Sequence, residues 1–476
     1  MQINISVNHN YYEEKPLIKD DLKREFGVRS NKVEKELFSS VYTLTTKSKK
    51  LKQLKIFGFK NQKNKLEDEE NLILKLYSKE EENKEKKYIV QTGLFAGVIY
   101  HKGYKFNITT KYGDTFLKRM LNFVNDIYID NEDISATKSD HKNSFLHIIA
   151  YLFIQSLEKS SVLGLPQEYV VKRQRSSKVR GKIDLNSYLK KDIPFRGRLT
   201  TTYREQVFVQ EILDVIFLAL RKLESTFGKD INKKVFGIQQ LLKQNYSGRF
   251  ATIETINKAK SHRVLYNPMF APFKKVLEYA EIILLDNELN FNKSDSLSTT
   301  GFLFDISQLF EVYLEKLLNH NFRDWNVTSQ EELSLYKGMY YKRNMYPDIV
   351  MKHKESDKII AFDAKFKDIL LKNNKLDRSD FYQIHTYIQY YEPNIILGGL
   401  IYPLSKNLEI SKAHSETLFG KSSNNNTKFI VDGINVNNTM NMNQLIDNER
   451  CFLSRIENIM NEKIETKIEQ TAYNNI

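Results

Sequence analysis

Two aspartates and one lysine, Asp348, Asp363 and Lys365, are spaced so that they could share one site. Two carboxylates brought side by side repel each other unless one is protonated or a cation lies between them. A hard divalent ion with oxygen ligands, most plausibly Mg²⁺, would resolve that repulsion. An ammonium beside the metal could orient a water, help to deprotonate it, or offset charge that develops on a phosphate.

A β-hairpin would bring these residues together. Segments 345–352 and 358–367 both have the composition of strands, and the polar residues between them indicate a turn. If the turn centres between Glu355 and Ser356, Asp348 lies directly opposite Asp363, with Cβ atoms about 4.5–5.5 Å apart. The alternation of side chains along the second strand then places Lys365 and Lys367 on the same face as Asp363.

Pro-Asp followed by Asp-x-Lys on the next strand is the pattern of PD-(D/E)xK nucleases. A solvated Lys/Asp face on an ordinary hairpin is the alternative interpretation. The flanking segments favour the nuclease: helical periodicity is expected over 302–318 before the hairpin and over 381–391 after it, and 395–402 reads as a buried strand. This order of helix, strand, strand, helix and strand is the expected core of that fold.

The two predicted helices add three candidate residues. Gln383 and Tyr387 are four residues apart and share one helix face. They are expected to orient the substrate or the lysine, and Gln-x-x-x-Tyr after the Asp-x-Lys strand resembles the RecB-type branch of the superfamily. Glu311 lies beside the apolar stripe of the first helix, where it is either a further acid at the metal or an exposed helix glutamate.

Composition limits the class of protein. The chain has 476 residues, 73 Lys and Arg against 59 Asp and Glu, and a net charge of +14, which favours a polyanionic partner such as nucleic acid. An A/T-rich coding genome is the alternative explanation for the many lysines. The single cysteine, Cys451, excludes an internal disulfide and a Cys-based zinc site. With no apolar segment near the roughly 20 residues that span a bilayer, we expect a cytoplasmic protein with no membrane partner.

The chain is expected to fold as α/β (α+β) in three regions. Residues 1–90 are rich in charge and are expected to contact a target or a partner. Residues 91–300 form a mixed α/β region that includes a hairpin around His101-Lys-Gly103 and a basic stretch over 172–198. Residues 301–476 form the nuclease domain.

Taken together, these segments resemble the McrC family, the nuclease subunit of McrBC restriction systems, over about residues 90–405. The anchors are Lys111, Phe116–Leu121, Gly164–Tyr169, Val179–Asp184, Tyr203, Asn267–Pro272, Leu309–Glu311, Pro347–Asp348, Asp363–Lys365, Gln383 with Tyr387, and Leu400–Pro403. Ile108-Thr-Thr-Lys111 departs from the family, which more usually has an acidic residue and a proline before the lysine.

The resemblance implies a DNA endonuclease that docks on a hexameric McrB-like AAA+ GTPase and stimulates its hydrolysis. It also implies that segment 172–198 belongs to the region that meets the ring, with Arg180 near the nucleotide; contact with DNA phosphates or a merely basic surface are the alternatives. We expect this chain to bind no nucleotide, because Ser415-Glu-Thr-Leu-Phe-Gly-Lys-Ser422 lacks the first glycine of a phosphate-binding loop.

Three other functions fit the same features. A restriction subunit of the same architecture could act without regard to methylation. A non-catalytic adaptor could bind DNA and regulate an AAA+ GTPase without cutting. A repair nuclease could act with a helicase on ends or single strands.

Overall fold

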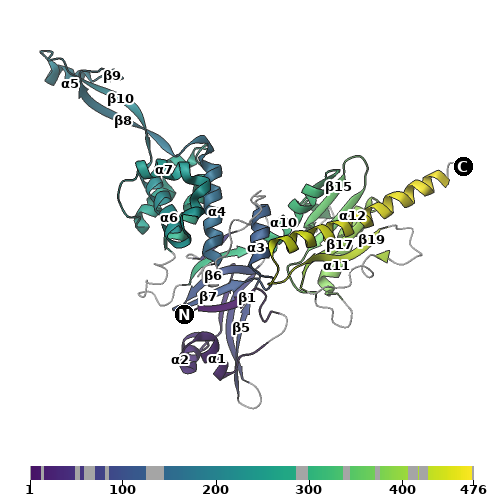
Figure 1. Ribbon diagram of the computed structural model, residues 1–476. Coiled ribbons are helices and arrows are strands. Elements are labelled where there is room, and N and C mark those ends of the chain that lie inside the picture. Colours follow the sequence, from purple (N-terminus) through teal and green to yellow (C-terminus); the bar gives the residue numbers. More distant parts are fainter. Residues whose placement is uncertain are drawn as a thin grey trace. The chain divides into compact units, whose positions relative to one another are not determined.

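The computed structural model describes residues 2–11, 15–48, 54–57, 70–80, 85–124, 144–285, 299–335, 343–369, 376–405, 416–417 and 427–473. It forms two compact units, one from residues 1–139 with 293–476 and one from residues 140–292 (Figure 1). The first unit therefore combines both ends of the chain. The expected regions 1–90, 91–300 and 301–476 do not coincide with these units, and their separate roles remain a prediction.

A five-stranded sheet in the first unit combines strands that come before and after the second unit in the sequence. Its order is β1 (Gln2–Ser6), β7 (Tyr104–Thr109), β6 (Phe95–His101), β11 (Thr300–Asp305) and β3 (Leu54–Phe57). The hairpin of β6 and β7 turns at Lys102 and Gly103, both with positive φ, as the sequence predicts. Strand β11 pairs antiparallel with β6, nearly 200 residues earlier in the chain.

The N-terminal region has its own small sheet and helices. Strands β2 (Tyr42–Thr45), β4 (Leu72–Glu80) and β5 (Lys86–Thr92) form a three-stranded sheet beside α1 (Lys19–Phe26) and α2 (Ser30–Leu37). The segment that leads into the hairpin of β6 and β7 is thus divided between two strands in two sheets, β5 and β6. The chain changes sheet at Gly93, where a Cβ would lie 1.8 Å from the Leu72 carbonyl oxygen. Only glycine fits so close to a neighbouring backbone.

The helix expected over residues 302–318 begins later than predicted. Phe302, Leu303 and Phe304 belong to β11, and helix α10 spans Ile306–Asn321. Asp305 caps the helix by accepting a hydrogen bond from the Gln308 amide at 3.1 Å. An apolar run of this kind suits a buried strand as well as a helix, and pairing with β6 decides for the strand.

The C-terminal part of the first unit is built on a six-stranded mixed sheet. Its order is β12 (Trp325–Thr328), β15 (Ile349–His353), β16 (Ile359–Ala364), β17 (Ile395–Leu404), β19 (Lys428–Asn435) and β18 (Glu416–Thr417). Helix α11 (Arg378–Tyr391) connects β16 to its parallel neighbour β17. The expected order of helix, strand, strand, helix and strand is confirmed as α10, β15, β16, α11 and β17. The chain adds β12, β13 (Leu333–Leu335) and β14 (Arg343–Met345) after α10.

A buried ion pair links three helices of the first unit. Arg119, on α3 (Asp114–Val124), forms two hydrogen bonds of 2.7 and 2.8 Å with Glu449 on α12 (Met442–Tyr473). The same carboxylate accepts a hydrogen bond of 2.6 Å from Tyr313 of α10. Glu449 is 2% exposed, so its charge depends on these two partners.

Replacing Glu449 with alanine should lower the free energy of unfolding by about 3–5 kcal/mol, because it leaves the Arg119 guanidinium buried without its partner. Chemical denaturation of the whole chain, followed by circular dichroism, measures the change. Glu457→Ala removes an exposed glutamate from the same helix and should change stability by less than about 0.5 kcal/mol. Equal effects of the two substitutions would contradict a structural role for the ion pair.

The second unit is a helical bundle with a projecting β-arm (Figure 1). The bundle contains α4 (Ser144–Ser160), α6 (Gln210–Phe227), α7 (Phe236–Gln244), α8 (Ile253–Ser261) and α9 (Phe273–Leu285). The arm consists of β8 (Gln167–Ser176) paired antiparallel with β10 (Leu199–Phe208), with β9 (Lys182–Ile183) and the short α5 (Leu185–Ser187) near its tip.

The arm carries charge and apolar surface far from any core. Most of β8 is exposed, and Val179, Leu185 and Phe195 near the tip are each more than half exposed. A long two-stranded ribbon with such side chains is typical of an element that is completed by a partner. Separately, none of the described helices is long and apolar enough to cross a bilayer.

Candidate active site

The hairpin of β15 and β16 has the register that the sequence predicts. Ile349 pairs with Phe362 and Lys352 with Ile359, so the same register continued by one residue places Asp348 opposite Asp363. The Oδ2 atom of Asp348 accepts a hydrogen bond of 3.0 Å from the Ala364 amide, which fixes the carboxylate against the neighbouring strand. Asp348 is 7% exposed and Asp363 is fully buried.

The Asp363 carboxylate has too few partners for a buried charge. Its Oδ2 lies 2.7 Å from the Lys365 Nζ in an ion pair, and its other polar neighbour is the Asp348 side chain, itself a carboxylate. Burial, and then the nearby Asp348 carboxylate, raise the pKa of Asp363 well above its usual value. A divalent cation would relieve both effects, because it supplies the missing ligand contacts and offsets the repulsion. The donor set therefore fits a metal held by Asp348 and Asp363.

Lys365 lies between the carboxylate pair and helix α11. Its Nζ contacts Asp363 at 2.7 Å and donates to the Gln383 Oε1 at 3.0 Å. Burial alone would lower the pKa of Lys365, but the charges of Asp363, Asp348 and Asp380 outweigh burial and raise it. The lysine is therefore a cation at neutral pH. Of the roles expected from sequence, this favours orienting a water and offsetting charge over accepting a proton.

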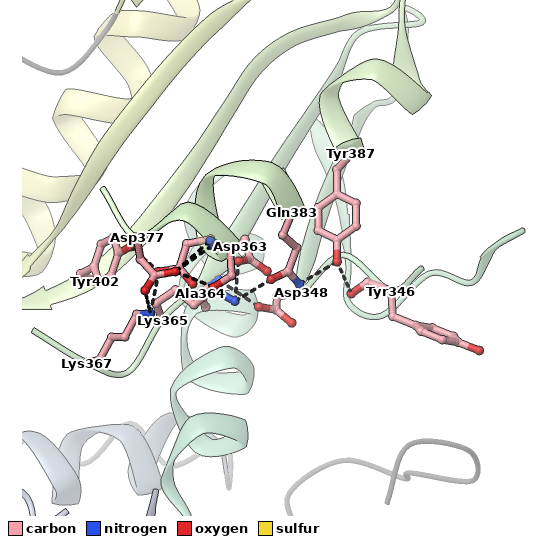
Figure 2. A network of polar contacts seen from close by, with 12 residues as sticks. Tyr346, Asp348, Asp363, Ala364, Lys365, Lys367, Asp377, Gln383, Tyr387 and Tyr402 are labelled. Carbon is pink, nitrogen blue, oxygen red and sulfur yellow. Dashed lines mark hydrogen bonds and ion pairs between the residues drawn. The ribbon is translucent and has the colours of Figure 1, made fainter. Parts of the chain in front are cut away.

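Gln383 and Tyr387 form one hydrogen-bonded chain with the lysine (Figure 2). Gln383 accepts from Lys365 through Oε1, and its Nε2 donates to the Tyr387 hydroxyl at 2.9 Å. The hydroxyl in turn donates to the Tyr346 carbonyl oxygen at 3.3 Å. Tyr346 lies two residues before Asp348, so this chain connects the lysine to the loop that carries the first aspartate. The prediction that both α11 residues share one face is confirmed.

Replacing Gln383 with alanine should lower the rate of DNA cleavage about 10–100-fold with little change in DNA affinity, because it releases the lysine without removing it. Single-turnover cleavage and equilibrium DNA binding separate the two effects. Gln389→Ala is the control, since Gln389 is an exposed glutamine on the same helix. Weaker DNA binding with an unchanged cleavage rate would contradict a positioning role.

Glu311 is linked through Gln330 to Pro347, the residue before Asp348. Its Oε2 accepts a hydrogen bond of 3.2 Å from the Gln330 side-chain Nε2. The backbone N–H of Gln330 donates to the Pro347 carbonyl oxygen at 3.0 Å. Within the described ranges, no three acidic, histidine or cysteine side chains are gathered closely enough to hold a metal. The fit to a metal therefore rests on two aspartates, and a ligand role for Glu311 remains a prediction.

The structure adds a second ion pair that sequence reasoning missed. Lys367 lies 2.7 Å from Asp380, and the Tyr402 hydroxyl donates to the same carboxylate at 3.1 Å. Asp380 is buried in the first turn of α11 and helps to hold Lys365 in its charged form. Its position three residues before Gln383 is the signal in the sequence that could have indicated it.

The segment 415–422, which ends in Gly-Lys-Ser, lies mostly outside the described residues. Only Glu416 and Thr417 of residues 415–422 are described, as the short strand β18. The expectation that this chain binds no nucleotide therefore remains a prediction.

Comparison with known proteins places the chain in a family. The family model described as the McrBC 5-methylcytosine restriction system component matches residues 66–403. The chain therefore belongs to the McrBC 5-methylcytosine restriction system component family, which confirms the resemblance drawn from the sequence. No curated protein sequence shows significant similarity to it.

A solved structure supports the fold. The chain is similar to one in the structure titled as a refined half-complex from a tetradecameric assembly of Thermococcus gammatolerans McrB AAA+ hexamers with bound McrC. The TM-score is 0.58 at 15% identity, covering 96% of this chain and 100% of that one. A chain in a cryo-EM structure of the Thermococcus gammatolerans McrBC complex matches with a TM-score of 0.33 at 15% identity, covering 68% and 88%.

Proposed function

We propose that this chain is the DNA endonuclease subunit of an McrBC-like restriction system, with a PD-(D/E)xK nuclease domain in its C-terminal part. The observation that carries the proposal is the convergence of Asp348, Asp363 and Lys365. The Asp363 carboxylate in this group is fully buried and has few polar partners. Bound Mg²⁺ would supply Lewis-acid activation of a phosphodiester and of a water. The reaction is hydrolysis of a DNA phosphodiester bond.

The residues of the site divide the work between them. Asp348 and Asp363 hold the metal, and the Ala364 amide keeps Asp348 aimed at it. The Lys365 ammonium offsets negative charge that develops on the phosphate as the attacking oxygen approaches. Gln383, supported by Tyr387, keeps that ammonium from turning to solvent and holds it beside Asp363.

The energy source lies in another chain. We infer a McrB-like AAA+ GTPase hexamer as the partner, because the similar McrC structure is titled as bound to McrB AAA+ hexamers and this chain has no recognisable nucleotide motif of its own. The exposed β-arm, with Arg180 near its tip, is the element we assign to the ring. The net charge of +14 suits DNA as the second partner.

Cleavage of plasmid DNA with and without cytosine methylation, in the presence of the cognate GTPase, GTP and Mg²⁺, tests the proposal. We expect cleavage that needs all components and methylated DNA. Equal cleavage of both plasmids would instead indicate the methylation-independent subunit. GTPase stimulation without any nicking would indicate the non-catalytic adaptor, and cutting confined to ends or single strands would indicate a repair nuclease.

A further inference from the structure

A basic cavity lies beside the strand that leaves the candidate active site. One wall is formed by residues 6–10 at the end of β1, and the other by residues 366–368 after β16. Its volume is about 260 Å³. The Asn8 Nδ2 donates to the Phe366 carbonyl oxygen at 3.3 Å, so the two walls are joined within one compact unit.

Cations outnumber anions on the cavity wall. Lys15, Lys111 and Lys367 contribute ammonium groups to the lining, against a single carboxylate from Asp368. The Lys367 ammonium is already paired with Asp380 outside the cavity. Lys111 forms an ion pair with Asp368, whose Oδ1 also accepts a hydrogen bond of 3.3 Å from the Tyr112 hydroxyl.

Asn10 holds the chain of Lys15 against this wall. Its Oδ1 accepts from the Lys15 amide at 2.8 Å, and its Nδ2 donates to the carbonyl oxygens of Lys15 and Val90 at 3.3 and 3.0 Å. Asn10 has a φ of 52° and is 8% exposed, so this turn is specifically built. It brings a lysine from the N-terminal region to a cavity that also touches the nuclease domain.

Two groups of the wall, Lys111 and His9, have lowered pKa values. Burial lowers the pKa of Lys111 to about 8 even with Asp368 beside it. Burial, and then the charge of Lys15, lower the pKa of His9, while Glu25 acts weakly in the opposite sense. An anion in the cavity would favour the protonated form of both groups.

We propose that this cavity binds a backbone phosphate of the DNA strand close to the phosphodiester that is cut. Two residues separate Lys365 from Asp368 in the chain, so their Cα atoms lie at most about 11 Å apart. A bound phosphate here would fix the register of the strand across the two aspartates. This inference rests on the proposed function, and it gives residues of the N-terminal region a direct part in positioning DNA.

DNA affinity of the full chain tests the proposal without chemistry. Fluorescence anisotropy with a labelled duplex, in EDTA so that no cutting occurs, gives the dissociation constant over a range of salt concentrations. Lys15→Ala combined with Lys111→Ala should weaken binding about 10-fold and reduce the slope of log affinity against log salt by about 1–2. Lys32→Ala with Lys35→Ala, on the exposed face of α2, is the control of equal charge and should change both less.

Asp368→Asn separates an anion site from a structural ion pair. It removes the one carboxylate of the cavity, so DNA binding should become a few-fold tighter, while Lys111→Arg should keep near wild-type affinity. If Lys111→Ala and Asp368→Asn both weaken binding, the pair is structural and the proposal is wrong. Absence of DNA binding by the wild type, or an effect no larger than that of the control, would also overturn it.

Two further outcomes are distinguishable. Loss of GTP binding in the lysine variants with unchanged DNA binding would mean that the cavity takes a free nucleotide phosphate, and the proposal would fail. A wild type that binds DNA with the expected variant pattern but never cuts it would support the cavity and refute the nuclease function instead. DNA binding in EDTA tests the cavity, whereas the cleavage assay tests the nuclease function, so failure of one proposal is distinguishable from failure of the other.

Discussion

Lys365→Ala should lower the rate of DNA cleavage about 10³-fold. The lysine is the partly buried cation at the carboxylate pair, and it is placed to stabilise charge that exists only in the transition state. Removing it leaves the aspartates and the hydrogen bond from Ala364 in place. Single-turnover cleavage of plasmid DNA with the assembled partner measures the loss, and the dissociation constant for DNA should change far less.

A matched lysine in the same hairpin provides the control. Lys354 is exposed in the turn between β15 and β16, and its Nζ donates only to the Arg323 carbonyl oxygen, at 2.6 Å. Lys354→Ala should therefore cut at nearly the wild-type rate. Asp348→Ala should behave as Lys365→Ala does, with assembly on the GTPase intact. Unaltered cleavage by either active-site variant would refute the assignment of the site.

Arg180→Ala should abolish stimulation of the partner's GTPase, a loss of up to about 10³-fold if the arginine reaches the nucleotide. The backbone beside Arg180 is held firmly: Gly181 has a φ of 74°, and a Cβ there would lie 2.4 Å from the Thr202 carbonyl oxygen. The guanidinium lies 6.0 Å from the centre of the Tyr203 ring, a weak cation–π contact that leaves it largely exposed. Steady-state GTP hydrolysis by the complex is the measurement.

Arg196→Ala is the control for the arm, because Arg196 is also exposed near the tip but belongs to a different Arg-Gly pair, Arg196-Gly197. It should reduce stimulation only slightly. Lys365→Ala should stimulate GTP hydrolysis normally while failing to cut, and Arg180→Ala should retain metal binding. If Arg180→Ala stimulates as well as the wild type, the tip contacts something other than the nucleotide interface.

The hairpin of β15 and β16 was predictable because its determinants are local. A polar turn between two apolar segments sets the register, and a period of two then decides which side chains share a face. Gln383 and Tyr387 followed from helical spacing for the same reason. Local pattern alone did not place Phe302–Phe304, because such a run suits strand and helix equally and its strand partner lies some 200 residues away.

The other features that the sequence did not predict depend on contacts between residues far apart in the chain. The cavity joins Asn8 and Lys15 to Asp368, residues more than 350 positions apart, and nothing in the sequence near any of them indicates the others. The ion pair of Arg119 with Glu449 is hidden in the same way. The family resemblance identified Lys111 as an anchor without giving it a role, and only the fold brings it beside Asp368, near the candidate active site.

Isothermal titration of Mn²⁺ or Mg²⁺ into the metal-free chain tests the central claim most directly. The account predicts one metal site in the wild type whose affinity falls at least about 100-fold in Asp363→Asn. That variant should also be more stable than the wild type without metal, because it removes the buried charge that burial and Asp348 disfavour. Equal metal affinity in both proteins, or none in the wild type, would contradict the account.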